Sequence, residues 1–271
     1  MTAAQPEEGK PGIDTTRPHP ARMYDWFLGG KDNYPVDEEM GRKVLAIEPN
    51  VPVLARMNRE FMRRATRWLA SRGIRQFLDI GTGIPTAPNL HQIAQGVAPD
   101  ARIVYCDNDP IVLAHAEALL RSTPEGAVDY VQADIRDSAT IIERASKTLD
   151  FGKPVALSLI ALLHFLSDED GAHDIVSGLL SRLVPGSYLV ITHGTHDFQP
   201  KDAQQVGSLY KSGSASLHTR TRADYEKFFA GLEFVEPGIV TGDNWHPEMG
   251  TPVPGAENAV KAGYLAVARK P

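Results

Sequence analysis

From Ile74 to the C-terminus, short apolar segments alternate with segments of helical periodicity, and this alternation constrains the fold more than any other feature. Each apolar segment is five to eight residues long, as buried strands are. Seven strands are expected, at 76–80, 102–106, 128–132, 154–161, 187–193, 234–241 and 263–269. Helices are expected between them at 88–95, 110–121, 140–149, 168–182, 202–210 and 222–230. This order predicts an α/β fold with a Rossmann-like, doubly wound, mostly parallel seven-stranded sheet.

The residues before this alternation, 21–73, are predicted to form an N-terminal helical extension that caps the sheet. A short aromatic helix stops at Gly29-Gly30 and is followed by helices at 37–48 and 52–72. The last helix carries a row of arginines that we expect to form a solvated face, at Arg56, Arg59, Arg63 and Arg67. Residues 1–20 are polar and contain several prolines and glycines, which predicts a flexible tail.

The composition limits the partners of the chain. Its 271 residues carry a formal net charge of −6, and because phosphate binding favours basic surfaces we expect no nucleic-acid partner. There is no run of about 18 apolar residues and no signal-peptide pattern, so we expect no membrane partner and a cytoplasmic location. A single cysteine, Cys106, excludes an internal disulfide and a cysteine-based zinc site.

A glycine turn follows the first expected strand of the sheet. In Phe77-Leu-Asp-Ile-Gly-Thr-Gly-Ile-Pro-Thr86, the strand runs into Gly81-Thr82-Gly83, and Asp79 lies two residues before the first glycine. Glycines permit positive φ angles and let a ligand approach the backbone closely. The alternative is a tight strand–helix turn that binds nothing.

Acidic residues also end the next two strands. Asp107 lies 24 residues after Gly83, close to the spacing of acids that bind ribose hydroxyls. Asp107, Asn108 or Asp109 could instead cap the helix that starts at residue 110. Asp134 follows the third strand. Because the carboxyl ends of parallel strands meet at one edge of the sheet, these acids and the glycine turn predict a nucleotide-type site there.

The residues after the glycine turn favour one cofactor over another. A dinucleotide fold needs a third glycine, but Thr86 stands at that position, preceded by Pro85, which has no N–H to donate. Asp79 would also repel a pyrophosphate. S-adenosylmethionine has no phosphate and carries a cationic head, so it fits better. A nicotinamide-dependent oxidoreductase is the disfavoured alternative.

Several segments resemble one known family. They are Arg22-Met-Tyr-Asp-Trp-Phe-Leu-Gly-Gly-Lys-Asp-Asn-Tyr34, Gln76-Phe-Leu-Asp-Ile-Gly-Thr-Gly-Ile-Pro-Thr86, Tyr105-Cys-Asp-Asn-Asp-Pro110 and Leu163-His-Phe165. This pattern is similar to the S-adenosyl methyltransferase family, a group within the seven-stranded S-adenosylmethionine-dependent methyltransferases. The resemblance covers roughly residues 15–270 and implies that residues 74–271 form the methyltransferase domain.

The resemblance also implies roles for the residues of the site. Asp79 and the turn Gly81-Thr82-Gly83 would hold the methionine end of the cofactor. Asp107 would bind the ribose hydroxyls. The remaining residues would contact the adenine or the sulfonium: Asn108 lies beside the adenine, Asp134 accepts its amino group, Ile135 packs on its ring, and Ala161 and His164 lie near the sulfonium.

The N-terminal extension could complete this site. Tyr24 and Tyr34 could cover the cofactor, because an aromatic face attracts a sulfonium. Lys31, Arg22 or Arg59 could pair with the methionine carboxylate. The alternative is that the aromatic residues only dock this helix onto the edge of the sheet.

Three histidines at the ends of strands are the candidate catalytic bases, namely His164, His193 and His196. The alternative for each is a hydrogen-bonded structural histidine. The spacing of His193 and His196 fits no zinc pattern, so no metal is expected. The sequence thus predicts methyl transfer from S-adenosylmethionine to oxygen or nitrogen of a small-molecule acceptor, with S-adenosylhomocysteine as product. A non-catalytic module that binds either compound is the alternative, and the edge helices would allow a homodimer.

Overall fold

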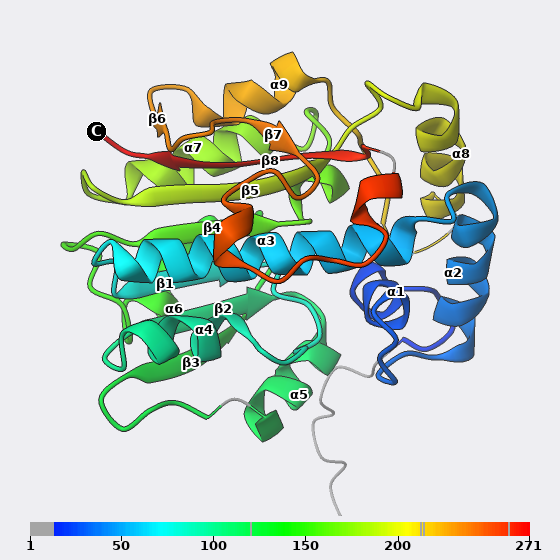
Figure 1. Ribbon diagram of the computed structural model, residues 1–271. Coiled ribbons are helices and arrows are strands. Elements are labelled where there is room, and N and C mark those ends of the chain that lie inside the picture. The colour runs from blue at the N-terminus through cyan, green and yellow to red at the C-terminus, as the bar shows by residue number, and fades with distance from the viewer. Residues whose placement is uncertain (1–13, 120, 212, 214, 260) are drawn as a thin grey trace, which may run out of the picture.

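The protein is built around one twisted sheet with helices on both faces (Figure 1). The structure, a computed structural model, describes residues 14–119, 121–211, 213, 215–259 and 261–271. Most of the predicted N-terminal tail, residues 1–13, lies outside the described residues. No helix in these ranges is long and apolar enough to cross a membrane.

The strand order confirms the predicted fold class. The order is β3-β2-β1-β4-β5-β8-β6, and β7 also pairs with β8. The strands are β1 (Gln76–Ile80), β2 (Arg102–Asp107), β3 (Ala127–Gln132), β4 (Ala156–Ile160), β5 (Tyr188–Gly194), β6 (Glu233–Phe234), β7 (Val240–Thr241) and β8 (Gly263–Arg269). Neighbours from β3 to β5 pair in parallel, whereas β8 runs antiparallel to β5, β6 and β7. The sheet is therefore mostly parallel, with one antiparallel strand.

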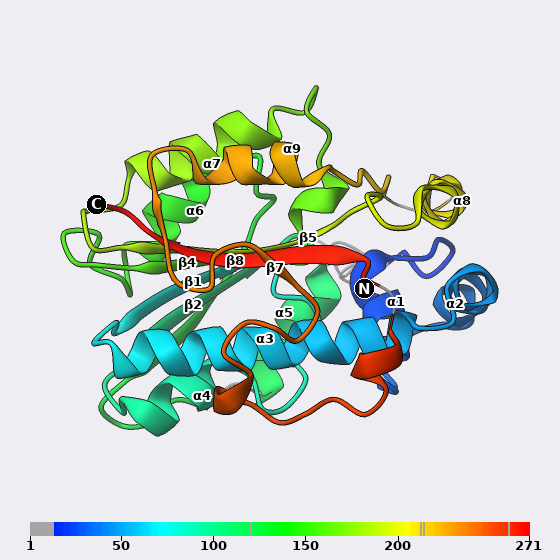
Figure 2. The same ribbon diagram turned by 45° about the horizontal axis from the view of Figure 1, so that its top comes forward.

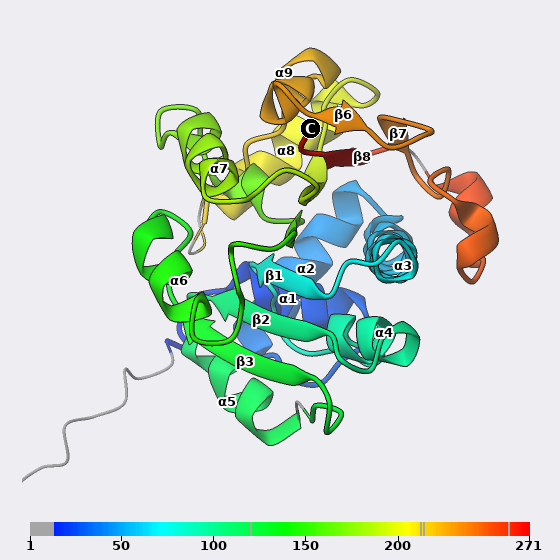
Figure 3. The same ribbon diagram turned by 90° about the vertical axis from the view of Figure 1, so that its left-hand side faces the viewer.

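Two helical layers cover the sheet (Figure 3). The helices are α1 (Pro20–Phe27), α2 (Pro35–Ile47), α3 (Val51–Ser71), α4 (Leu90–Val97), α5 (Pro110–Leu119), α6 (Ser138–Ala145), α7 (Ala172–Ser181), α8 (Pro200–Tyr210) and α9 (Arg222–Glu226). Helices α6, α7 and α9 bury their apolar residues against one face, and α3 and α4 bury theirs against the other. Because β1, β2, β4 and β5 are buried on both faces, they read as continuous apolar runs in the sequence.

The N-terminal helices are placed in two different ways. Helix α3 lies along the sheet, and its Phe61 is fully buried in the core between sheet and helices. Helices α1, α2 and α8 group together at one end of the molecule (Figure 2), where Met23, Phe27 and Val44 form a separate apolar cluster. This end is the one at which the parallel strands finish, so α1 and α8 lie close to the ligand edge of the sheet.

Some predicted elements differ from the structure. The predicted strand 234–241 is wrong: Gly238 has a φ of +80° and donates to the carbonyl of Val235, so a turn separates β6 from β7. The predicted helix 168–182 begins only at Ala172, because the residues before it form a turn that ends at Gly171 (φ +77°). The predicted helix 88–95 begins at Leu90 and continues through Gly96 to Val97.

The arginine row of α3 is not the solvated face that we expected. Only Arg56 is exposed. Arg59 and Arg63 donate to the backbone carbonyls of Thr86 (2.7 Å) and Ala87 (3.2 Å), and Arg67 donates to that of Met249. Helical periodicity alone missed this role, because the loops that these side chains hold are distant in the sequence.

Candidate active site

A cavity lies at the carboxyl ends of β1, β4 and β5 and has two adjoining lobes. The smaller lobe, of about 340 Å³, lies beside β2 and β3, and the larger, of about 580 Å³, extends under α1, α3 and α8. Six residues line both lobes: Pro20, Ala21, Gly81, Gly83, Ala161 and Phe165. The two lobes therefore meet at the glycine turn after β1 and at the chain that leaves β4.

The glycine turn can be formed only by residues that accept positive φ. Gly81 and Gly83 have φ angles of +74° and +65°. A Cβ at Gly81 would lie 2.7 Å from Cδ1 of Leu162, whereas one at Gly83 would meet nothing within 4 Å. Gly81 is thus needed for both conformation and packing, while Gly83 faces open space in the cavity.

Asp107 stands at the end of β2 in the wall of the smaller lobe. Its Oδ2 accepts a hydrogen bond from the Gly83 N–H (2.8 Å) and its Oδ1 accepts one from the Asp109 N–H (3.0 Å). Burial raises the pKa of Asp107. The cap of α5 is Asp109, which accepts from the Ile111 N–H at 3.0 Å. Asp107 therefore braces the glycine turn and is not the helix cap.

The smaller lobe combines polar and apolar groups. Asn108, Asp134 and Ile135 line it, and the amide of Asn108 donates to Oδ2 of Asp134 at 3.2 Å. Arg136 pairs with the same carboxylate at 3.1 Å. The structure therefore brings together the side chains that the resemblance assigned to ribose and adenine.

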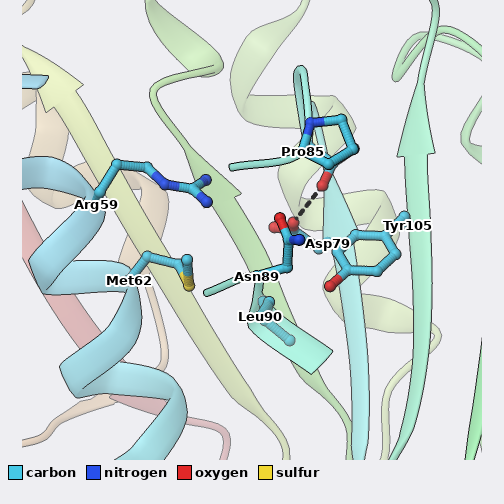
Figure 4. A pocket seen from close by; sticks show the side chains of 8 residues that line it. Arg59, Met62, Asp79, Pro85, Asn89, Leu90 and Tyr105 are labelled. Atoms are coloured by element: carbon cyan, nitrogen blue, oxygen red, sulfur yellow. Dashed lines mark hydrogen bonds between the residues drawn. The ribbon is translucent and has the colours of Figure 1, made fainter. Parts of the chain in front are cut away.

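Asp79 and Arg59 face each other at the inner end of the larger lobe (Figure 4). Oδ2 of Asp79 accepts a hydrogen bond from the Thr82 hydroxyl (2.7 Å), and burial raises the pKa of Asp79 to about 6. Arg59 reaches from α3 toward this carboxylate, and its Nε is buried without a hydrogen-bond partner. A buried donor without a partner is costly, so an anionic group placed here would satisfy it. A carboxylate and a guanidinium side by side fit the zwitterionic end of an amino acid.

The chain leaves β4 through a strained residue. Ala161 has a φ of +54°, and its N–H donates to the Thr192 hydroxyl at 2.8 Å. Such a φ is rare for a residue with a Cβ, and strained residues of this kind concentrate at functional sites. The turn leads into the short 3₁₀ helix η1 (Leu163–Phe165), from which His164 and Phe165 line the larger lobe.

The three candidate histidines have different surroundings. His193 is buried, its Nδ1 lies 2.7 Å from the Gly194 carbonyl, and its Nε2 lies 2.6 Å from the Arg220 guanidinium. Both nitrogens are therefore engaged, and burial lowers the pKa of His193 well below its ordinary value. His196 does not line the cavity and contacts the Thr219 hydroxyl at 3.0 Å. His193 lines the lobe but has no nitrogen free to accept a proton.

His164 is the histidine whose ring is open to the cavity. The Gly194 N–H donates to its Nδ1 at 3.4 Å, which places the ring proton on Nε2, and Nε2 has no partner among the described residues. Burial, and then the nearby Arg220, lower the pKa of His164 to about 4. The imidazole is therefore neutral near neutral pH and carries an N–H on Nε2.

The structure places three predicted residues outside the cavity wall. Arg22 is buried and pairs with Asp37 at 3.2 Å. Tyr34 packs beside Ile84, with the Arg22 guanidinium 5.3 Å from its ring centre. Lys31 is exposed. These residues shape the N-terminal extension, and of the candidates there only Tyr24 and Arg59 line the larger lobe.

Two residues near the site were not among the site residues that the sequence predicted. Arg220 is buried and donates to the carbonyls of Leu163 (3.0 Å) and Leu166 (2.8 Å), so it holds η1 in place. Tyr210, at the end of α8, lines the larger lobe beside Phe165. Neither residue belongs to a local motif, because each reaches the site from a segment after β5.

Comparison with known proteins agrees with this geometry. The sequence profile of the S-adenosyl methyltransferase family matches residues 6–271. The chain therefore belongs to this family and is an S-adenosylmethionine-dependent methyltransferase.

Two solved structures are similar over almost their whole length. A DUF574 family protein from Streptomyces avermitilis MA-4680 is 49% identical, with a TM-score of 0.90, over 96% of this chain and 100% of that one. A candidate methyltransferase from Thermobifida fusca YX is 37% identical, with a TM-score of 0.86, over 96% of this chain and 97% of that one. None of the curated proteins matches the chain.

Proposed function

We propose that the enzyme methylates an oxygen or nitrogen atom of a small molecule bound in the larger lobe. The observation that carries this proposal is the lobe itself: it encloses about 580 Å³ beside the glycine turn, under α1 and α8, and the methionine end of the cofactor would fill only part of it. Ligand pockets for small molecules have volumes of this order. S-adenosylmethionine supplies an electrophilic methyl group on a sulfonium, and holding an acceptor in line with it provides most of the rate.

We propose that the smaller lobe binds the adenosine part of the cofactor. Asp107 would accept hydrogen bonds from the ribose hydroxyls, since its carboxylate lines the lobe and is fixed by the glycine turn. Asn108 and Asp134 would bind the adenine edge, and Ile135 would pack against its ring. The chain after β4, at Ala161, closes this lobe toward the larger one.

The methionine end of the cofactor would bind between Asp79 and Arg59. The ammonium group would pair with Asp79, and the carboxylate would satisfy the buried Nε of Arg59. Gly81, Thr82 and Gly83 would let this end lie close to the backbone. Tyr24 is tied to the Ala55 carbonyl by a hydrogen bond of 2.9 Å, so it would form a fixed wall of the lobe.

A module that binds the cofactor without turnover is the second candidate function. The absence of a free histidine base in the cavity wall favours it, since within the described ranges His193 is engaged at both nitrogens and His164 carries its proton on Nε2. Methyl transfer to a good nucleophile needs no strong base. The presence of a lobe large enough for an acceptor therefore favours the enzyme over the binding module.

Turnover separates the two candidate functions. The purified enzyme is incubated with S-adenosylmethionine labelled in the methyl group and a library of small hydroxyl and amino compounds, and labelled product is measured. Labelled product that disappears in Arg59→Met and persists in the exposed Arg56→Met control would support the proposal. Tight cofactor binding without transfer to any compound would favour the binding module.

A further inference from the structure

The part of the larger lobe under α1 and α8 has an apolar and aromatic wall. The wall is formed by side chains of α1, α3, η1, α8 and the loop after α8: Phe27, Leu54, Phe165, Tyr210 and Leu217. The ring centres of Phe165 and Tyr210 are 5.8 Å apart. A wall of this kind binds an apolar body of about the size of a ring system.

The charged groups of this lobe are already committed or lie at its rim. Its charged side chains are Asp25, Arg59, Asp79, Asp243, Glu257 and Lys261. Two of them belong to the proposed cofactor site. Asp25 accepts two hydrogen bonds of 2.9 Å from the loop after α1, and Asp243 pairs with Arg64. Glu257 and Lys261 are exposed. A charged group in the interior of the lobe, away from this rim, would therefore lose its hydration without gaining a partner.

Two lobe-lining residues beside Phe165 have a polar side-chain atom that can serve an acceptor. These atoms are Nε2 of His164 and the hydroxyl of Tyr210, neither of which has a hydrogen-bond partner in the part of the chain that the structure describes. Both can donate a hydrogen bond. Because burial lowers the pKa of His164 to about 4, its imidazole is too weak a base to activate an aliphatic alcohol.

The lack of a charge partner inside the lobe and the weak basicity of His164 together define a class of acceptor. An aliphatic amine would enter charged, and an aliphatic alcohol would need a strong base. A phenol or an aryl amine is uncharged near neutral pH. A phenol is acidic enough to lose its proton as the methyl group is transferred, and an aryl amine has a free lone pair without losing a proton first. Its ring also matches the aromatic wall.

We infer that the acceptor is an uncharged phenol or aryl amine with an apolar body, and that His164 and Tyr210 donate hydrogen bonds to its polar groups. This inference rests on the proposed function. In the transfer, the oxygen or nitrogen of the acceptor forms a bond to the methyl carbon as the carbon–sulfur bond breaks. The electron pair of the broken bond stays on sulfur, and the proton of the acceptor leaves to water.

Three compounds that share one phenol ring test the inference. They are 4-ethylphenol, which is neutral, tyramine, which is cationic, and 4-hydroxyphenylacetate, which is anionic. Each is titrated calorimetrically into the protein saturated with S-adenosylhomocysteine. We expect 4-ethylphenol to bind at least about tenfold more tightly than either charged compound, because a buried charge without a partner costs well over 1.4 kcal/mol.

Variants locate the binding site. Leu54→Asp should abolish binding of 4-ethylphenol, and Tyr210→Phe should weaken it about fivefold, the effect of one lost hydrogen bond. Val97→Asp is the matched control, because Val97 is an exposed apolar residue of α4 away from the lobe. All three variants should retain the affinity for S-adenosylhomocysteine.

The outcomes separate this inference from the proposed function. Equal or tighter binding of a charged compound, binding of none of the three at millimolar concentration, or indifference to Leu54→Asp would overturn the inference alone. Failure of the wild-type protein to bind S-adenosylhomocysteine, which is measured first, would refute the proposed function instead.

Discussion

The substitution Gly81→Ala tests how the glycine turn and the chain after β4 are fitted together. The new Cβ would lie 2.7 and 2.9 Å from the two Cδ atoms of Leu162, so one side chain or the backbone must shift. Overpacking of this kind costs about 1–3 kcal/mol. The φ of +74° adds about 1–2 kcal/mol for a residue with a Cβ. We therefore expect a total loss of about 2–5 kcal/mol in the free energy of unfolding.

Gly83→Ala is the matched control. Gly83 has a similar φ of +65°, but its Cβ would meet nothing within 4 Å, so only the conformational cost of about 1–2 kcal/mol applies. Urea unfolding of the ligand-free proteins measures both losses. Gly81→Ala should be the more destabilising substitution by about 1–3 kcal/mol.

A double-mutant cycle isolates the contact. Leu162→Ala removes the atoms that the new Cβ would meet, so Gly81→Ala should cost about 1–3 kcal/mol less in that background. Equal losses for the two glycine variants, together with additive effects of Gly81→Ala and Leu162→Ala, would refute the reasoning.

Three further predictions concern side chains around the site. Asp134→Ala should weaken S-adenosylhomocysteine binding in a titration, whereas Asp137→Ala should leave it unchanged and cost about 1 kcal/mol of stability, because Asp137 caps α6 by accepting from the Thr140 N–H. Because burial raises the pKa of Asp79 to about 6, the ligand-free folded protein holds this proton more tightly than the unfolded chain. The free energy of unfolding should therefore fall by up to about 3 kcal/mol as the pH rises from about 4 to about 6. Thermal unfolding measures this loss, and Asp79→Asn should remove it. Arg220→Met leaves the carbonyls of Leu163 and Leu166 without their donor and should lower the free energy of unfolding in urea by about 2–4 kcal/mol, whereas the exposed Arg56→Met should leave it almost unchanged.

The sheet could be predicted from the sequence because its central strands are buried on both faces. Such strands leave uninterrupted apolar runs, and β8 was predicted with the bounds that the structure has, Gly263–Arg269. The prediction was wrong at 234–241, where an apolar run is broken by the turn at Gly238. Tertiary contacts decide such edge segments, because two-residue strands carry no periodicity of their own.

The candidate site was predictable only where it follows a strand. Asp79, Asp107 and Asp134 each come directly from a strand end, so one topological rule gathers them at one edge. The N-terminal extension obeys no such rule. Its Arg22 and Lys31 look alike in sequence, yet one is buried in an ion pair and the other is exposed.

Calorimetric titration with S-adenosylhomocysteine, with NAD as comparison ligand, tests the central assignment most directly. The wild-type protein should bind S-adenosylhomocysteine and not NAD. Asp107→Ala should weaken that binding at least about tenfold, since it removes the hydrogen bonds of a charged acceptor. Asp129→Ala should not, because Asp129 is an exposed acid of the adjacent strand that lines neither lobe. Absence of S-adenosylhomocysteine binding, or a preference for NAD, would contradict the account.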